Sequence, residues 1–333
     1  MVTRKEVAEY AGVSSATVSN VVNGKGIVSD RNTQKVLEAI RKLGYRPNMV
    51  ARSLKTKESM QIALISDNIT NPYFSEVALG MEAEARKTGY VVCLLNSWND
   101  SCYMDEILGR QFDGIILLTD KMPVESINNF AKRNVPIVFA GNMDYKNMDS
   151  SITQVHIDTY KGARQLFEYL IKLGHKRIGF FSGSKFKDIY CGDYRMRAYM
   201  DVLLENSISV DPSLMCLSGE TLDTAFDWTY DILQRKDRPT AIFAKNDNIA
   251  LAVISAANKV KLKIPEDLSI AGFDNLSVGR YYLPALTTVD LPKYELGEKA
   301  MTLLLRKIRG ESINDFVMLT KLVIRDSVSA ASL

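Results

Sequence analysis

The alternation of short apolar runs with segments of helical length, which begins at Gln61, constrains the fold of this chain most. The runs are QIALIS, YVVCLL, DGIILL, VPIVFA, TQVHI, KRIGFFS, TAIFAK, LSIAGF, LTTVD and KLVIRDS. Almost continuous apolar runs rich in β-branched residues are typical of parallel strands whose two faces are covered by helices. About ten strands are more than one doubly wound sheet holds comfortably, so we predict a body of two lobes.

Composition argues against several other classes of protein. The chain has 333 residues, of which 46% are hydrophobic, so it is neither disordered, collagen-like nor a disulfide-stapled miniature. The four cysteines are scattered without a C-x-x-C pair, which predicts reduced side chains. The sequence shows neither a leader pattern nor an apolar run of about 18 residues, so we expect a cytoplasmic protein.

The first sixty residues form a basic head. They carry eleven Lys and Arg against five Asp and Glu, whereas the rest of the chain is slightly acidic. A basic module attached to a larger body is typical of proteins that bind a polyanion. A solvated charged face would give the same excess, so the charge alone does not decide the function.

Three short amphipathic helices are predicted in the head. Their N-terminal caps are Thr3, Ser14 and Ser29 or Asp30, and the glycines that stop them are Gly12, Gly24 and Gly44. We expect Val36, Leu37, Ile40 and Leu43 to form the apolar face of the third helix. Two short helices joined by a tight glycine-containing turn outline a helix-turn-helix unit.

Motifs along the whole chain carry a resemblance to a known family. They are AGVSSATVSNVVNG, RPNMVARSLKTKES, GHKRIGFFSG, AKNDNIALAV, IPEDLSIAGFDN, LTTVD and LVIRDS, in this order between Ala11 and Ser327. In sequence and spacing they resemble the LacI/GalR family of bacterial transcription regulators. The resemblance implies a repressor that binds pseudo-palindromic operator DNA as a homodimer, lies on the nucleoid when bound to DNA, and needs no cofactor and no metal.

The resemblance also implies a division into domains. A helix-turn-helix DNA-binding head is expected over 1–46, a hinge helix or linker over 47–58, and an effector-binding and dimerisation body over 59–333. The body is expected to have the periplasmic-binding-protein-like α/β fold of two doubly wound parallel-sheet lobes. The N-lobe would span about 59–158 and 290–318, and the C-lobe about 159–289 and 319–333.

The second helix of the head is the expected base-contacting element. The first turn of such a helix enters the major groove, where side chains meet base edges. The resemblance assigns base contacts to Ser15, Ala16 and Asn20, and contacts to the DNA backbone to Thr3, Ser14, Thr17, Ser19 and Asn23. The family usually has Arg where this chain has Asn20, and Asn pairs better with adenine than with guanine. The alternative that Asn20 merely faces solvent stays open.

The segment from Pro47 to Leu54 resembles the family's hinge helix. A helix this short is marginal in water, so ordering on contact with DNA is physically reasonable. Leu54 would be the apolar wedge between central base pairs, with Asn48, Ala51 and Arg52 lining the minor groove. Alternatively, Leu54 is a linker residue buried against the body.

Polar and aromatic residues that follow predicted strands of the body are candidates for effector contacts. By resemblance these are Tyr73, Phe74, Asn142, Arg195, Asn246 and Asp274. Arg, Asn and Asp suit the vicinal hydroxyls of a sugar, and the aromatic rings offer an apolar wall. Asn246 and Asp274 could instead be helix caps. Gly141 stands where sugar-responsive members often carry an acid, so a purine or nucleoside is the alternative effector.

Two other functional classes fit the sequence less well. A solute-binding protein without a DNA role would share the body, but the basic head argues against it. An enzyme on a doubly wound fold would need a phosphate-binding or catalytic motif, and the sequence contains no G-x-G-x-x-G after the first strand, no P-loop and no H-E-x-x-H. His156 and His175 lack the neighbours that a metal site requires.

Overall fold

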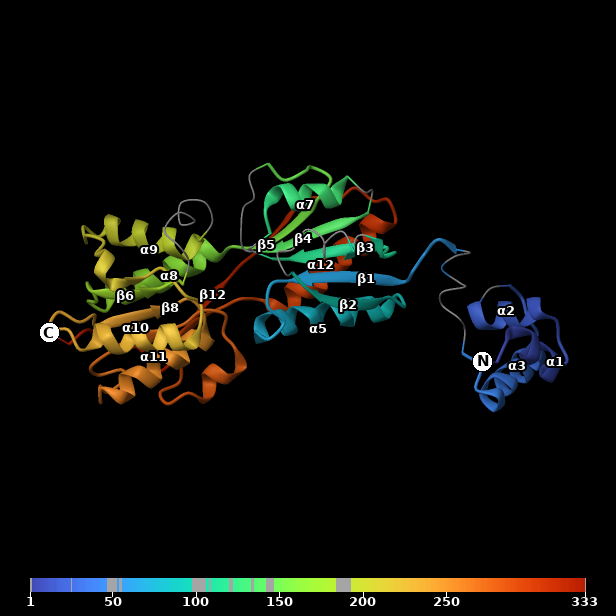
Figure 1. Ribbon diagram of the computed structural model, residues 1–333, viewed down its shortest axis with the longest axis horizontal. Helices are drawn as coiled ribbons and strands as arrows, with labels where there is room; N and C mark the ends of the chain where they lie inside the picture. The colour runs from blue at the N-terminus through green and yellow to red at the C-terminus, as the bar shows by residue number, and fades with distance from the viewer. Residues whose placement is uncertain are drawn as a thin grey trace. The chain divides into compact units, whose positions relative to one another are not determined.

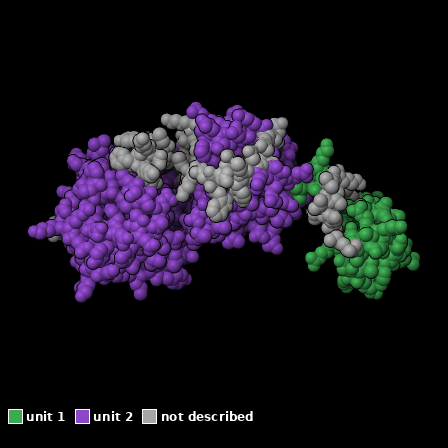
Figure 2. Space-filling model, viewed as in Figure 1, with its two compact units in different colours: residues 1–59 green, residues 60–333 purple. Residues whose placement is uncertain are grey.

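The computed structural model divides into two compact units, residues 1–59 and 60–333, coloured separately in Figure 2. The structure describes residues 2–24, 26–46, 53, 56–97, 106–107, 109–119, 122–132, 135–141, 147–183 and 193–332.

The described residues of the first unit include the helices α1 (Arg4–Ala11), α2 (Ser15–Asn23) and α3 (Asp30–Leu43). The predicted caps of the first two helices are confirmed, because Thr3 and Ser14 accept hydrogen bonds from backbone amides of the first turns. Gly12, Gly24 and Gly44 end the helices with φ of 63°, 60° and 64°, a left-handed conformation that glycine adopts without a steric penalty.

The core of the head differs from the prediction at one position. Val7, Val18 and Val36 are fully buried between the helices. Leu37 was predicted to face this core, which is wrong, because 47% of its surface is exposed. Ala39 is buried instead, since positions three and four residues apart share one face of a helix and Ala39 follows Val36 by three.

A six-stranded parallel sheet forms one lobe of the second unit. Its spatial order is β11 (Phe316–Met318), β5 (Thr153–Ile157), β4 (Ile137–Gly141), β3 (Gly114–Leu118), β1 (Gln61–Ser66) and β2 (Val91–Asn96). The described part of this lobe includes the helices α5 (Pro72–Lys87), α7 (Val124–Ala131) and α12 (Lys293–Ile308). Figure 1 shows α7 on the side of the sheet opposite α5 and α12.

The strands of this sheet are buried on both faces. In β1, Ile62 and Leu64 pack in the cluster that holds α5 and α12, whereas Ala63 and Ile65 pack in the cluster that holds α7. Alternate side chains of a strand point to opposite faces, so a strand covered on both sides is apolar throughout. The continuous run QIALIS is explained in this way, and the predicted parallel α/β architecture is confirmed.

A four-stranded parallel sheet forms the second lobe. Its order is β7 (Met215–Cys216), β6 (Ile178–Phe181), β8 (Ala241–Ala244) and β9 (Ser269–Ala271). The described helices packed around it include α8 (Thr159–Lys172), α9 (Tyr194–Glu205), α10 (Leu222–Leu233) and α11 (Asp247–Lys259), with the short 3-10 helices η2 (Pro212–Leu214) and η3 (Ser277–Tyr281). Phe180 and Phe243 pack with the α8–α9 layer, and Phe181 and Ile242 with the α10–α11 layer.

The chain passes between the lobes more than once. An antiparallel pair, β10 (Thr288–Asp290) with β12 (Lys321–Val323), lies outside both parallel sheets. Two short strands, β7 and β11, were not predicted. Each has two or three residues, and Phe316 and Val317 of β11 are exposed, so neither leaves a buried apolar run in the sequence.

Candidate DNA-binding helix and effector site

Helix α2 presents a polar face to solvent. Ser15, Ala16 and Asn20 are exposed and Ser19 is half-buried, while Val18 on the opposite face is fully buried in the head. The side chain of Asn20 lies beside Gly26, where an added Cβ would come within 3.1 Å of its Nδ2 atom. The residues predicted to contact bases therefore share one accessible face of one helix.

Hydroxyl groups at the start of α2 order its first turn. Ser14 Oγ accepts a hydrogen bond from the Thr17 amide at 3.1 Å and lies 2.9 Å from Thr17 Oγ1. At the other end, Asn23 Nδ2 donates to the Ser19 carbonyl at 2.7 Å. At the N-terminal end of the helix, backbone amides and hydroxyls can meet phosphate oxygens, and at the C-terminal end the side-chain amide of Asn23 can do so.

The start of α1 is closed by a reciprocal capping box. The Thr3 backbone amide and hydroxyl donate to Glu6 Oε2 at 2.6 and 2.8 Å, and Thr3 Oγ1 accepts from the Glu6 amide at 3.3 Å. Hydrogen bonds from Thr3 lower the pKa of Glu6, so this carboxylate stays ionised at the N-terminal end of the helix, where negative charge is favourable.

Five predicted site residues lie outside the described residues: Asn48, Ala51, Arg52, Leu54 and Asn142.

In the four-stranded lobe, Arg195 links two elements at the carboxyl ends of the strands. It lies in the first turn of α9, its Nε donates to Asp193 Oδ1 at 3.1 Å, and its Nη1 donates to the Lys245 carbonyl at 2.9 Å. The guanidinium lies 5.7 Å from the centre of the Phe273 ring. Burial opposes ionisation of Asp193, but the Arg195 charge and hydrogen bonds from Arg195 and Ser182 outweigh it and lower its pKa.

Asp274 is a buried carboxyl group held on a strained backbone. Its side chain follows β9, only 6% of the residue is exposed, and its φ of 99° is rare for any residue except glycine. No described residue donates a hydrogen bond to its carboxylate. Burial and the neighbouring Asp247 carboxylate raise its pKa to about 8, against the opposing charge of Arg195.

Asp247, which follows the predicted effector residue Asn246, is a second buried carboxyl group. Its oxygens accept hydrogen bonds from Thr288 Oγ1 and from the Leu276 amide, each at 2.7 Å. Burial raises its pKa to about 7 despite these hydrogen bonds. An added Cβ at Gly272 would lie 2.3 Å from Asp247 Oδ1, so only glycine permits this approach. The signal in the sequence is an acid next to Asn246, shortly after the apolar run of β8 ends at Ala244.

Asn246 is a helix cap, the alternative role that the sequence left open. It is the N-cap of α11, and its Oδ1 accepts a hydrogen bond from the Ile249 amide at 2.9 Å. Asp274 does not cap a helix, since the next helix, η3, begins at Ser277.

On the six-stranded lobe, Tyr73 and Phe74 lie in the first turn of α5, after the N-cap Asn71. Their rings meet edge to face with centres 5.2 Å apart. Tyr73 is only 6% exposed and belongs to the core, whereas Phe74 is half-buried. Phe74 is therefore the more accessible of the two rings.

A network that the sequence did not predict lies at the carboxyl end of β1. Asp67 Oδ1 accepts hydrogen bonds from the Ser97 hydroxyl, at 2.6 Å, and from the Thr119 hydroxyl. These residues follow β1, β2 and β3, which are neighbours in the sheet.

Gly141, whose place an acid often takes in sugar-responsive members, is the buried last residue of β4.

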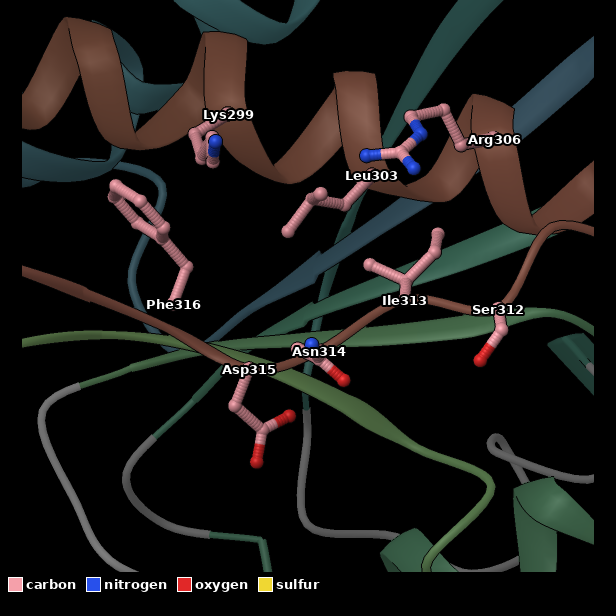
Figure 3. Close-up of a pocket in the computed structure, with 8 residues that line it drawn as sticks. All are labelled: Lys299, Leu303, Arg306, Ser312, Ile313, Asn314, Asp315 and Phe316. Carbon is pink, nitrogen blue, oxygen red and sulfur yellow. The ribbon is translucent and has the colours of Figure 1, made fainter.

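A surface pocket of about 250 Å³ lies elsewhere, between α12 and the segment before β11 (Figure 3). Lys299 Nζ lies 4.0 Å from the centre of the Phe316 ring, and Arg306 Nε pairs with Glu311 at 2.6 Å. Asp315 points away from α12 in Figure 3. The pocket contains none of the predicted effector residues.

The histidines give no sign of a metal site. His175 is buried, with Nδ1 2.9 Å from Thr240 Oγ1 and Nε2 2.9 Å from the Ser329 carbonyl. Among the residues that the structure describes, no three His, Cys, Asp or Glu side chains gather as metal ligands would. None of the helices in that part of the chain combines the length and apolarity needed to cross a membrane.

Comparison with known proteins identifies two family models in the chain. Residues 3–48 match the lacI family of bacterial regulatory proteins, and residues 167–328 match the periplasmic binding protein-like domain. The HTH-type transcriptional repressor CytR of Escherichia coli strain K12 is 35% identical, with 98% of this chain and 96% of that protein covered.

Solved structures of transcriptional regulators share the fold. The Lac repressor dimer bound to operator and the anti-inducer ONPF matches with a TM-score of 0.84 and 25% identity, over 99% of both chains. The complex of the transcriptional regulator CelR with cellobiose matches with a TM-score of 0.71 and 27% identity, over 98% of this chain and 100% of that one. These proteins are transcriptional regulators rather than enzymes, and they match both parts of the chain. The chain belongs to the LacI family of bacterial transcriptional regulators.

Proposed function

We propose that this regulator is a repressor whose operator affinity is controlled by a sugar or sugar derivative bound in the body. The observation that carries the effector assignment is the buried Asp274 carboxyl group, which no described residue satisfies, near the charge of Arg195. A buried polar group without a partner is unfavourable unless a ligand supplies one. Sugar hydroxyls can donate to Asp274 and accept from Arg195.

In the DNA complex, we assign base contacts to Ser15, Ala16 and Asn20 on the exposed face of α2. Thr3, Ser14, Thr17, Ser19 and Asn23 would contact the DNA backbone around this helix. The carboxamide of Asn20 can bond two edge atoms of adenine, so we expect adenine at the operator position that it faces. The head proper would comprise residues 1–46.

We assign minor-groove contacts to the hinge segment, residues 47–58. Leu54 would insert between central base pairs and bend the duplex, while Asn48, Ala51 and Arg52 would line the groove. Effector binding to the body, residues 59–333, would change the relative stability of two lobe arrangements and so alter hinge packing on DNA. Couplings of this kind are worth about 1–3 kcal/mol.

The remaining effector contacts would come from Phe74, Tyr73 and Asn142 of the N-lobe and from Asn246 of the C-lobe. The half-buried ring of Phe74 suits the apolar face of a sugar ring or of a base. A purine or nucleoside is therefore the alternative effector, since a base could stack on Phe74 while ribose hydroxyls meet Asp274.

We propose that the active form is a homodimer on a pseudo-palindromic operator. Tyr281 and Leu283 are 82% and 89% exposed, which is unusual for large apolar side chains. Tyr282 bonds to the Asp247 carbonyl of α11 at 3.3 Å, so this segment lies beside α11, where Leu251 is 45% exposed. A second copy covering this surface would bury these side chains. Such a dimer would act on chromosomal DNA in the cytoplasm.

Two measurements test the proposal. Selection from a randomised duplex pool with the full-length protein should enrich a palindrome, and binding to it should weaken steeply with salt as Lys and Arg displace counterions. Enrichment of no sequence would favour a solute-binding protein without a DNA role. A thermal-shift screen should then find a stabilising compound among monosaccharides, disaccharides, purines and nucleosides, and Asp274→Ala should abolish that shift. A normal shift in Asp274→Ala would place the effector elsewhere.

A further inference from the structure

Lys293 occupies an unusual position for a cation. It is the first residue of α12, where the helix dipole disfavours positive charge, and only 4% of its side chain is exposed. Burial of an ammonium group is costly unless acceptors surround it. The lysine must therefore be held there by specific partners.

The ammonium group has such partners on two sides. Its Nζ donates to the carbonyls of Asp274 at 2.5 Å and Leu291 at 3.3 Å, with Asn275 O at 3.5 Å. On the other side it pairs with Glu76 Oε2 of α5 at 3.5 Å. Four acceptors, three backbone carbonyls and one carboxylate, therefore surround the three N–H donors of the lysine.

The loop that receives Lys293 is strained. Asp274 and Asn275 follow each other with φ of 99° and 51°, and two successive left-handed residues that are not glycine persist only where surrounding contacts fix them. The Asn275 side chain is fixed by Arg325 at 2.6 Å and by Asp290 at 2.7 Å. Its backbone carbonyl and that of Asp274 are fixed by Lys293.

Helices α5 and α12 form a rigid support for the lysine. A Cβ at Gly80 of α5 would lie 2.0 Å from the Tyr294 carbonyl, and a Cβ at Gly297 of α12 would lie 2.0 Å from the Val77 carbonyl. The backbones of the two helices are therefore in direct contact at both glycines. Movement of Lys293 relative to α5 would break this packing.

We propose that Lys293 is the positioning residue of the effector response, whose ammonium fixes the Asp274–Asn275 backbone of one lobe to the α5–α12 pair of the other. The role of Lys293 in the effector response rests on the proposed contact between Asp274 and the effector. The link that Lys293 makes between the Asp274–Asn275 backbone and the α5–α12 pair does not. Because α5 also carries Phe74, the Lys293 ammonium group fixes the position of Phe74 relative to Asp274, and both are predicted effector contacts.

Amide hydrogen exchange on the full-length protein, without DNA or effector, tests the positioning. The reporters are the amides of Asp274, bonded to Val289 O at 3.0 Å, and of Leu276, bonded to Asp247. We expect Lys293→Met to speed their exchange about 10- to 100-fold, because hydrogen bonds from a charged donor are lost. Lys293→Arg, which keeps a charged donor, should restore most of the protection.

The matched control is Lys299→Met on the same helix, which should leave both amides unchanged. Glu76→Gln removes only the link to α5 and should give an intermediate increase, about threefold. Unchanged exchange in Lys293→Met, or a uniform increase over the whole body, would overturn the proposal. If Lys293→Met does not fold, unchanged exchange in Glu76→Gln overturns it instead. None of these outcomes depends on whether an effector or operator is found.

Discussion

Replacing Asp274 by Asn should stabilise the protein. Burial and Asp247 raise the pKa of Asp274 from an ordinary 3.8 to about 8, so the folded state holds a neutral carboxyl group at pH 7. Keeping this carboxyl group protonated costs about 1.4 kcal/mol for each pH unit above its ordinary pKa. The cost to the free energy of folding is therefore about 4 kcal/mol at pH 7. Asn is neutral in both states, has nearly the same shape and tolerates the φ of 99°. We expect Asp274→Asn to raise the free energy of unfolding by about 2–4 kcal/mol at pH 7.

The pH dependence follows from the direction of the shift. Between the ordinary and the raised pKa the folded state binds more protons than the unfolded state, so wild-type stability falls as pH rises from about 4 to about 8. The advantage of Asp274→Asn should therefore shrink steadily as the pH is lowered toward 4. Urea unfolding followed by circular dichroism at about pH 5, 6, 7 and 8 measures the difference.

The control is Asp227→Asn, at an exposed carboxyl group of α10. It should change stability by no more than about 0.5 kcal/mol at any of these pH values. The reasoning is refuted if Asp274→Asn is no more stable than the wild type at pH 7, or if its advantage is the same at every pH.

Three further predictions concern DNA binding and packing. Leu54→Ala should weaken binding to the selected operator at least about tenfold in gel shifts, because the wedge is lost, while the thermal shift with effector stays normal; equal affinity would exclude the wedge. Asn20→Arg should move the preferred base from adenine to guanine, by about 1–3 kcal/mol across a base-substituted operator series, and an unchanged preference would mean that Asn20 only faces solvent. Gly297→Ala should destabilise the body by about 1–3 kcal/mol or more in urea, since its Cβ would meet the Val77 carbonyl at 2.0 Å; a neutral effect would show that α5 and α12 can separate.

Local sequence signals predicted those parts of the fold that local physics decides. The helix ends of the head depend on a cap residue and on a glycine a few residues away, so Thr3, Ser14 and Gly12 could be assigned from the sequence. The apolar runs that form strands covered on both faces could also be assigned from the sequence. Strand β11 was missed because its pairing with β5 joins residues 161 positions apart, between Phe316 and Val155, and leaves exposed side chains.

The candidate site was predicted less completely, because its residues meet through tertiary packing. Asp274 and Arg195 could be named because the family resemblance places effector contacts at their positions, after predicted strands of the body. The partner of the Asp274 carbonyl, Lys293, could not, because nothing in the sequence brings it near that loop. A lysine directly after a proline at a helix start was the one available sign, since the helix dipole disfavours it there.

The loop around Asp274 holds several energetically unfavourable features of the body. Asp274 combines a left-handed backbone with a buried carboxyl group, and Asp247 beside it has a pKa raised to about 7. Neither feature stabilises the fold, so the surrounding contacts must hold the loop against its own preferences. A ligand that donates hydrogen bonds to Asp274 would remove part of this penalty in the bound state alone. The ligand would favour the lobe arrangement in which it can make these hydrogen bonds, because it binds that arrangement more tightly than the other.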